Sequence, residues 1–408
     1  MNAEVDRPMK ILHVVPTYLP AVRYGGPIYS VHALCQNLAA AGHEVHVFTT
    51  SVDGPQDSDV SHDAAVERDG VQVHYSRSRW LRRLYYSAEL AAQLSANIGQ
   101  FDVVHLHSVF LFPTLAGARA SVRAKVPYVL SPRGMLVRDL IERRSASTKR
   151  GWIRVFERTN LSHATRIHLT SREEERALVD LGLALAPTSI IPNGVNAPSA
   201  FSADAVSSDV RTLIAEGFDI LSFGRISWKK GLDRLIEAMV GLPDARVIIA
   251  GNDEDGLAPK LRSAAEQLGL DNRLRVLPRH IGETDKEALF AAARVFVLPS
   301  LSENFGNVVA EAMIRGLPVV VTERVGAAEV VQASGGGIVT GSGPNDIAAA
   351  VVGLLASNDR LATIGAAGAK YARERLTWSG IALRFAEMYR EMVDQNPDYA
   401  VAGRVAAA

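Results

Sequence analysis

Cysteine and long apolar runs are nearly absent from this sequence of 408 residues. Its one cysteine, Cys35, excludes a disulfide framework and a metal site built from cysteines. Cys35 lies in the apolar, helix-like stretch VHALCQNLAAAG, which is typical of a buried structural thiol rather than a nucleophile. No apolar run approaches the roughly 18 residues of a membrane-spanning helix, and the N-terminal residues lack the apolar core of a signal peptide. We therefore expect a cytoplasmic location.

An excess of charge of one sign is also missing, because 44 Lys and Arg balance 44 Asp and Glu. Residues 119–172 are nevertheless basic, with 13 Lys and Arg against Asp139, Glu142 and Glu157. A second basic segment, 77–86 (RSRWLRRLYY), interleaves arginines with aromatic side chains. Each segment is either a solvated surface or a binding surface for an anionic partner. That partner would be a phosphate-bearing acceptor or the anionic inner face of the cytoplasmic membrane. No nucleic-acid recognition motif occurs, so we expect no nucleic-acid partner.

Common cofactor and metal motifs are missing too. Neither half of the chain has G-x-G-x-x-G after its first strand, which argues against a nicotinamide dehydrogenase. The acidic runs 57–59 and 253–255 are typical of surface turns. His105 and His107 are two residues apart, but no third ligand with suitable spacing accompanies them. We therefore expect neither a metal nor a cofactor.

Strands alternate with helices twice along the chain. The first half contains the strand-like runs KILHVV, EVHVFTT, VQVHY, DVVHLHS, PYVLS, RIHLTS and SIIPNG, with helices expected at 28–41, 88–99, 113–124 and 171–182. The second half contains FDILSF, ARVIIAG, RLRVLP, RVFVLPS, PVVVT and GGIVT, with helices expected near 230–240, 257–268, 285–292, 305–315, 344–356 and 359–375. Apolar strands joined by helical crossovers indicate an α/β fold with parallel sheets covered on both faces.

This pattern predicts two doubly wound, Rossmann-like domains that face each other across a cleft. The first is expected to span residues 1–200 and the second residues 205–376, with an Ala-, Ser- and Pro-rich linker around 192–208. A last amphipathic helix, 378–393, is expected to cross back to the first domain. Ligands of such folds bind at the carboxyl ends of the strands.

The most informative segment is 300–316, SLSENFGNVVAEAMIRG. Glu303 precedes the expected helix and Glu311 lies two turns into it, which places them on the order of 12 Å apart along the helix axis. We expect free backbone N–H groups at Gly306, Asn307 and Val308 to lie between them, where the helix dipole favours a phosphate. The spacing suits a nucleotide sugar, from its hexose to its ribose. The alternative is a solvated helix face with no ligand.

The segment GRISWKKG, 224–231, follows another expected strand. Arg225 ends that strand and Lys230 begins the next helix, so the two cations flank a turn and can neutralise a diphosphate. Lys229 is the competing candidate. We prefer Lys230 because it immediately precedes Gly231.

Two further segments follow strands of the first half. Gly25 and Gly26 either let the backbone approach a ligand closely or form only a turn. Strand alternation places His105 and His107 on one face of the sheet. They are either a metal pair or one structural and one cleft-facing histidine, and in the second case His107, nearer the end of the strand, faces the cleft.

Together these segments resemble the retaining glycosyltransferases of family 4, which have the GT-B fold. The resemblance covers nearly the whole chain and depends on the paired glycines, DVVHLHS, IPNGVN, GRISWKKG and, above all, ENFGNVVAEAM followed by GLPVVVT. The segments SPRGML and TSREEE are similar to a subgroup that builds polysaccharides and exopolysaccharides. Val325–Glu329 departs from the family pattern, which has two adjacent glycines there. Arg133 stands where many relatives have histidine.

The resemblance implies metal-independent transfer of a hexosyl unit, with retention, from a nucleoside-diphosphate sugar to a saccharide or lipid-linked acceptor. Glu303 would hold hydroxyls of the donor sugar, and Glu311 would hold the ribose. Arg225 and Lys230 would stabilise the leaving diphosphate, and His107 would contact the donor near its reacting carbon. The remaining implied contacts are Gly25, Gly26, Phe305, Gly306, Asn307 and Val308 with the donor, and Tyr24 and Arg133 with the acceptor.

Two other functions fit the same architecture. A nucleotide-sugar epimerase would convert the nucleotide sugar with no acceptor present. A non-catalytic nucleotide-sugar-binding protein would not need Glu303, Arg225, Lys230 and His107 together.

Overall fold

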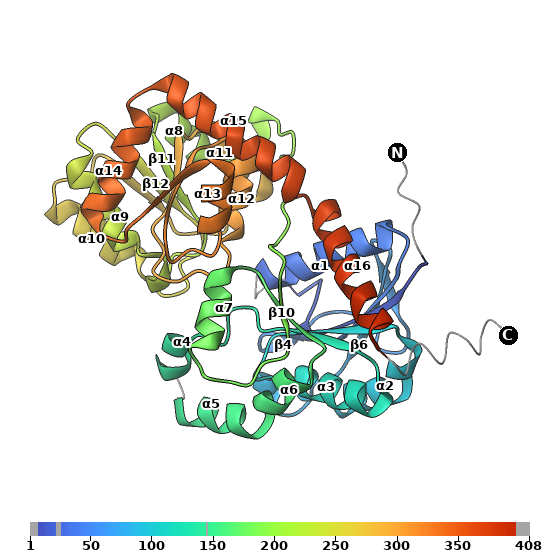
Figure 1. Ribbon diagram of the computed structural model, residues 1–408. Coiled ribbons are helices and arrows are strands. Elements are labelled where there is room, and N and C mark those ends of the chain that lie inside the picture. Colours follow the sequence, from blue (N-terminus) through green and yellow to red (C-terminus); the bar gives the residue numbers. More distant parts are fainter. Residues whose placement is uncertain (1–6, 22–25, 144–145, 397–408) are drawn as a thin grey trace. The chain divides into compact units, whose positions relative to one another are not determined.

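The computed structural model describes residues 7–21, 26–143 and 146–396, and these divide into two compact units. The first unit holds the described residues up to Gly194 together with those from Trp378 onward, and the second unit is Val195–Thr377. Each unit is built on a sheet of mainly parallel strands covered by helices (Figure 1). Both units thus have the α/β, Rossmann-like architecture that the alternation of strands and helices predicted.

The sheet of the first unit has the strand order β10-β9-β8-β7-β1-β2-β6-β5, and only β5 and β6 are antiparallel. Its strands are β1 (Lys10–Thr17), β2 (Glu44–Thr50), β5 (Val66–Arg68), β6 (Val71–Ser76), β7 (Val103–His107), β8 (Tyr128–Ser131), β9 (Arg166–Leu169) and β10 (Thr188–Ile190). Its helices are α1 (Gly26–Ala40), α2 (Ala88–Asn97), α3 (Phe112–Ala124), α4 (Arg138–Arg143), α5 (Ala146–Trp152), α6 (Arg158–His163), α7 (Arg172–Val179) and α16 (Trp378–Asp394). The register pairs His13 of β1 with His105 of β7, which brings two histidines together in the centre of the sheet.

The sheet of the second unit is parallel throughout, with the order β13-β12-β11-β14-β15-β16. Its strands are β11 (Ile220–Phe223), β12 (Val247–Ala250), β13 (Leu274–Leu277), β14 (Val295–Leu298), β15 (Val319–Thr322) and β16 (Gly337–Thr340). Its helices are α8 (Ser208–Glu216), α9 (Leu232–Ala238), α10 (Ala258–Gln267), α11 (Glu283–Ala292), α12 (Asn307–Ile314), α13 (Ala328–Ser334), α14 (Pro344–Leu355) and α15 (Asn358–Arg375). Strands β12, β14 and β15 are buried along their whole length, as helices on both faces require.

Helix α16 belongs to the first unit although it follows the whole second unit in the sequence. It lies beside α1 (Figure 1). Trp378, Ile381, Phe385 and Tyr389 recur at three- or four-residue intervals and are buried against the core of the first unit. Apolar burial along one face therefore holds the C-terminal helix on this unit.

The boundary between the units differs from the predicted one. It lies between Gly194 and Val195, whereas the sequence placed residues up to 200 in the first domain. The N–H of Val195 donates to the carbonyl of Leu376 at 2.7 Å. The N–H groups of Ser199 and Ser207 donate to carboxylates of α11 at 3.1 and 2.8 Å. These bonds make residues 195–207 a packed part of the second unit rather than a free linker.

Helices α4 to α6, α8 and α13 were not predicted from the sequence. Segment 138–163 is rich in charge and has few apolar side chains at helical spacing, and α13 is only seven residues long. Their amphipathic pattern was too weak to identify. Among the described helices none is by itself long and apolar enough to cross a membrane, although the bent pair α14 and α15 meets the length and composition test together.

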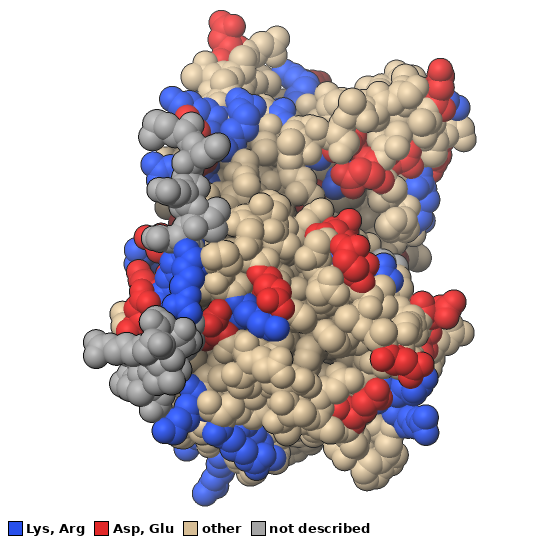
Figure 2. All heavy atoms as spheres, turned by 90° about the vertical axis from the view of Figure 1, so that its right-hand side faces the viewer, with Lys and Arg blue, Asp and Glu red and all other residues tan. Residues whose placement is uncertain are grey.

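The balanced charge is spread over the surface. Figure 2 shows one face, on which Lys and Arg side chains are interspersed with Asp and Glu side chains. No extended area of a single sign is visible on that face. On this face, charge-based recognition therefore depends on local groups.

Candidate active site

An ion pair between Lys230 and Glu303 lies at the carboxyl-terminal edge of the second sheet. Lys230 ends a short 3-10 turn after β11, and Glu303 follows β14. The Lys230 Nζ lies 2.5 Å from a carboxylate oxygen of Glu303, and the two side chains are 14% and 25% exposed. The segments 224–231 and 300–316, on which the prediction of a nucleotide-sugar site depends, therefore contact each other.

Backbone contacts fix the turn that carries Lys230. The N–H of Leu301 donates to the carbonyl of Lys229 at 2.7 Å. Gly231 has a φ of 59°, and a Cβ there would lie 2.3 Å from the carbonyl oxygen of Pro299. Only glycine allows this close approach of the two loops. The contacts direct Lys230, rather than Lys229, to the carboxylate of Glu303.

Helix α12 begins beside Glu303. Gly306 has a φ of 86°, and a Cβ there would lie 3.2 Å from the Cγ of Glu303. The helix therefore starts at Asn307 instead of at 305, so the predicted spacing of Glu303 and Glu311 along one helix axis does not apply. The backbone N–H groups of Phe305, Gly306 and Val308 form no hydrogen bond with a residue that the structure describes. These N–H groups at the start of α12 lie near Lys230, and a helix start of this kind can bind an anion.

Glu311 and Arg225 are each paired with a residue that the sequence did not indicate. The carboxylate of Glu311 lies 3.3 Å from the Nζ of Lys286 on α11. Burial lowers the pKa of Lys286, but the charges of Glu311 and Glu283 outweigh it and raise that pKa above its ordinary value. The guanidinium of Arg225 lies 3.1 Å from Glu254, and both side chains are largely exposed. Glu311 is thus paired at a partly buried position, whereas the pair of Arg225 lies at the surface.

A buried hydrogen-bond chain crosses the first unit from α16 to the end of β10. His168 Nε2 bonds to the carbonyl of Ile191 at 2.8 Å and must donate, so its Nδ1 accepts from the hydroxyl of Ser131 at 2.7 Å. Ser131 Oγ then accepts from His105 Nε2–H at 2.7 Å. The remaining His105 Nδ1 accepts from the hydroxyl of Tyr389 at 2.7 Å. Each proton in the chain has one position, and both histidines are neutral.

A second chain joins Arg133, His107 and His13. Arg133 donates to His107 Nδ1 at 3.1 Å, so His107 carries its proton on Nε2 and donates to His13 Nδ1 at 3.0 Å. The Nε2–H of His13 is buried and has no partner among the described residues. Burial, followed by the charge of Arg133, lowers the pKa of His13 to about 3 and that of His107 well below its ordinary value.

His13, His105 and His107 lie close enough together to suggest a metal site. The hydrogen bonds argue against it, because Nε2 of His105 is protonated and its Nδ1 accepts from Tyr389. The guanidinium of Arg133, which donates to His107, adds a positive charge beside the cluster. This donor set does not fit a cation.

Two family models match this chain, one in each half. Residues 208–371 match "Glycosyl transferases group 1", and residues 25–194 match a "Glycosyl transferase 4-like domain". The chain belongs to the family 4-like glycosyltransferases. It is 27% identical over 399 residues to an uncharacterized glycosyltransferase of Methanocaldococcus jannaschii, with 94% of this chain and 98% of the relative covered. It is 28% identical over 401 residues to a D-inositol 3-phosphate glycosyltransferase of Xylanimonas cellulosilytica, with 91% and 93% covered.

Solved structures assign the fold of this glycosyltransferase to the GT-B class. A sucrose-phosphate synthase from Thermosynechococcus elongatus has a TM-score of 0.71 at 21% identity, with 94% of this chain and 99% of that chain covered. Anabaena HepE in complex with UDP-glucose has a TM-score of 0.70 at 22% identity, with 94% and 100% covered. The predicted family and fold are thereby confirmed.

The remaining predicted site residues of the glycosyltransferase stay predictions. Tyr24 and Gly25 lie outside the described residues, and Gly26 is the exposed first residue of α1. His107 is 1% exposed and both of its ring nitrogens are engaged, so its predicted contact with the donor requires a rearrangement. Arg133, with a φ of 56°, uses its guanidinium to hold His107 and Asn193.

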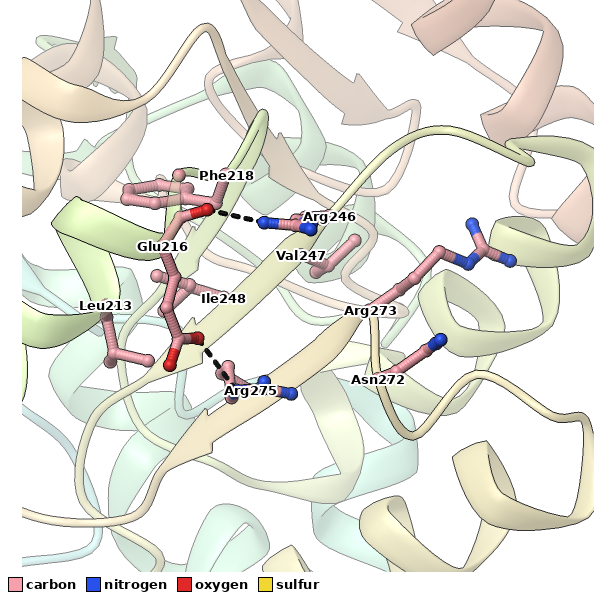
Figure 3. Close-up of a pocket in the computed structure, with 10 residues that line it drawn as sticks. Leu213, Glu216, Phe218, Arg246, Val247, Ile248, Asn272, Arg273 and Arg275 are labelled. Carbon is pink, nitrogen blue, oxygen red and sulfur yellow. Dashed lines mark hydrogen bonds and ion pairs between the residues drawn. The ribbon is translucent and has the colours of Figure 1, made fainter.

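A cavity of about 160 Å³ in the second unit is distinct from this site (Figure 3). It lies at the amino ends of β12 and β13, the edge of the sheet opposite to Lys230 and Glu303. Figure 3 shows that Arg246 and Arg275 point to Glu216, at 2.5 Å from its carbonyl and 3.3 Å from its carboxylate. These cations are used within the protein, so the cavity does not offer them to a ligand.

The sequence missed several residues that support the site. His13 interrupts the apolar run KILHVV, and this polar residue within a buried strand was a usable signal. Lys286 gave no signal, because its partner Glu311 is distant in the sequence. Glu174 was noted only as part of TSREEE. It is buried, and its carboxylate accepts from the N–H groups of Thr170 at 2.8 Å and Gly134 at 2.7 Å.

Removing Glu174 should destabilise the first unit. Burial raises the pKa of Glu174, against the opposing effect of its hydrogen bonds and of Arg133. Glu174→Ala removes the carboxylate that accepts from the N–H groups of buried Thr170 and half-buried Gly134, and we expect a loss of about 3 kcal/mol in the free energy of unfolding. Denaturant unfolding would measure it. Glu173→Ala is the matched control, because Glu173 is ion-paired with exposed Arg176. Equal stability of the two variants would contradict this role.

Proposed function

We propose that this glycosyltransferase transfers a hexosyl unit from a nucleoside-diphosphate sugar to a hydroxyl of a saccharide or lipid-linked acceptor. The observation that carries the proposal is the Lys230–Glu303 pair beside the start of α12. A cation and free N–H groups stabilise the negative charge that develops on the leaving diphosphate. An adjacent carboxylate accepts hydrogen bonds from sugar hydroxyls.

The relatives support the same donor class. HepE was solved in complex with UDP-glucose, and the relative from Xylanimonas is named for transfer to an inositol phosphate. These names support a nucleotide sugar as donor and a hydroxyl as acceptor. The names of the relatives differ in the product or acceptor, so the base, the sugar and the acceptor of this glycosyltransferase require direct measurement.

Retention and independence from metal are part of the proposal. Glu303 is ion-paired with Lys230 and suits a hydroxyl-binding role better than that of a nucleophile, which favours attack by the acceptor on the face that the diphosphate leaves. Lys230 and the N–H groups of α12 supply the stabilisation that a metal would otherwise supply. The anomeric configuration of the product, determined by NMR, and activity in the presence of EDTA test the two points separately.

A panel of UDP, GDP and ADP sugars in a thermal-shift assay tests the donor class. A ligand at 100 times its Kd raises the free energy of unfolding by about 2.7 kcal/mol, whereas the free sugar should give no shift. No shift with any nucleotide sugar would reject the proposal. Conversion of the nucleotide sugar without an acceptor would favour an epimerase.

Glu311→Ala should weaken binding of the nucleotide. Loss of a carboxylate that accepts from ribose hydroxyls should raise the Kd about tenfold, because one charge-assisted hydrogen bond is worth at least about 1.4 kcal/mol. Isothermal titration with the nucleoside diphosphate measures it. Glu323→Ala removes an exposed carboxylate of the same unit and is the control. An unchanged Kd for Glu311→Ala would refute its assignment to the ribose.

A further inference from the structure

A pocket of about 510 Å³ lies in the first unit. It is formed by α4, by the continuous helical segment 146–163 and by residues that follow α7. Four arginines line it: Arg138, Arg150, Arg154 and Arg158. Ile141, Ile153, Leu181 and Leu183 form the apolar wall, and Glu142 is the acidic residue among them. We refer to this site as the arginine pocket.

The helical segment presents its arginines on one side. Arg150, Arg154 and Arg158 follow one another at four-residue intervals, and the turn between the last two, Ile153–Glu157, is a π-helix. On the opposite side the buried carboxylate of Glu157 accepts from the N–H of Phe110 at 2.7 Å and from the indole N–H of Trp152 at 2.9 Å. These bonds anchor the inner face of the segment, so the arginines face outward at a fixed place. A π-turn is often found at functional sites.

Two of the four arginines have no hydrogen-bond or ion-pair partner among the described residues. Arg138 donates to the carbonyl of Asp180 at 2.5 Å, and Arg150 lies 3.4 Å from Glu142. Arg154 and Arg158 form no hydrogen bond or ion pair with a residue within the described parts of the chain. Two such guanidinium groups one turn apart beside aliphatic side chains are suited to a ligand with both an anionic and an apolar part.

We propose that the arginine pocket binds a phosphate ester carried on a hydrocarbon chain. The guanidinium forks of Arg154 and Arg158 match the oxygens of a phosphate. Ile153, Leu181 and Leu183 provide the contact for the chain, and the volume is within the usual range of ligand sites. Single-stranded nucleic acid would need stacking aromatic side chains, and none lines the pocket. Binding at this pocket can be tested without the transfer reaction, because all of its lining residues lie in the first unit.

Isothermal titration of the full chain with dodecyl phosphate, below its micelle concentration, tests the proposal. We expect it to bind at least tenfold more tightly than inorganic phosphate, which lacks the chain, and than dodecyl maltoside, which lacks the charge. The double variant Arg154→Gln/Arg158→Gln should lose at least tenfold in affinity for dodecyl phosphate. Both side chains are exposed and unpaired, so the variant should fold normally, as circular dichroism would verify.

The control variant Arg123→Gln/Arg176→Gln removes the same charge from exposed positions of the same unit outside the pocket. It should bind dodecyl phosphate like the wild type. Equal affinity of the two double variants, or wild-type binding no tighter than that of dodecyl maltoside, would overturn the proposal.

Vesicles distinguish the two sources of such a phosphate. Sedimentation with phosphatidylglycerol vesicles, lost in Arg154→Gln/Arg158→Gln and absent with phosphatidylcholine, would identify a lipid headgroup within a bilayer. Binding of dodecyl phosphate without sedimentation would identify a dissolved phosphorylated amphiphile. Absence of binding in both experiments would refute the site.

Discussion

Replacing Lys230 with methionine is expected to lower the turnover of the transfer reaction about 100- to 1000-fold, as the loss of one preorganised stabilising group commonly does. The Nζ of Lys230 is held 2.5 Å from Glu303 and is mostly buried, so water cannot easily replace it. Methionine keeps the length and the apolar contacts of the side chain and removes the charge together with the ion pair to Glu303. The loss should therefore fall on kcat, with a smaller change in KM.

Lys229→Met is the matched control. Lys229 is the neighbouring residue, and its carbonyl, which a substitution retains, accepts from Leu301. Steady-state kinetics with the donor identified by thermal shift should show near-normal turnover for Lys229→Met. If both variants behave alike, Lys230 does not act on the leaving group.

Lowering the pH from 7.5 to 5.5 is expected to reduce the free energy of unfolding of the first unit by about 4 kcal/mol. His13, His105, His107 and His168 are buried and neutral, and burial lowers the pKa of His13 and of His168 to about 3. The unfolded chain takes up protons near pH 6.5, whereas the folded unit does not. Stability is therefore complete above pH 6.5 and is lost as the pH falls from there toward 3, by about 1.4 kcal/mol per pH unit for each group.

Some neighbouring groups add to this loss of stability at low pH and others reduce it. Arg133 opposes protonation of His13 and His107, and Tyr389 and Ser131 fix His105 as a neutral ring. Burial raises the pKa of Glu157 and of Glu174, so these two groups gain stability on acidification and offset part of the loss. Burial also lowers the pKa of His43 and of His74, so the histidines outweigh the two carboxylates and a net loss of stability remains, comparable to much of the stability of a domain.

Denaturant unfolding at several pH values measures this loss. The second unit is an internal control, because His280 is the one histidine between residues 195 and 377. NMR of the imidazole protons should show four rings that do not titrate down to pH 5. Titration of all four near pH 6.5 would contradict the prediction.

Much of the site followed from local sequence. A carboxylate after one strand, a lysine before a glycine after another and a helix start between two glutamates each have a chemical meaning that depends on a few neighbouring residues. The predicted helix start is two residues early, because Gly306 is left-handed and lies where a Cβ would press on Glu303, Val325 and Leu298. Periodicity alone does not contain those contacts.

The sequence by itself determined the α/β class, the alternation of strands and helices and the segments with Glu303, Lys230 and Glu311, because short-range apolar patterns and turn residues encode them. Only the tertiary structure decided which charges are paired. Lys230 with Glu303, Lys286 with Glu311 and Arg133 with His107 are separated by between 25 and 73 positions. Such pairs form when sheet order and register bring distant strand ends together, and side-chain spacing along the chain carries no record of that order.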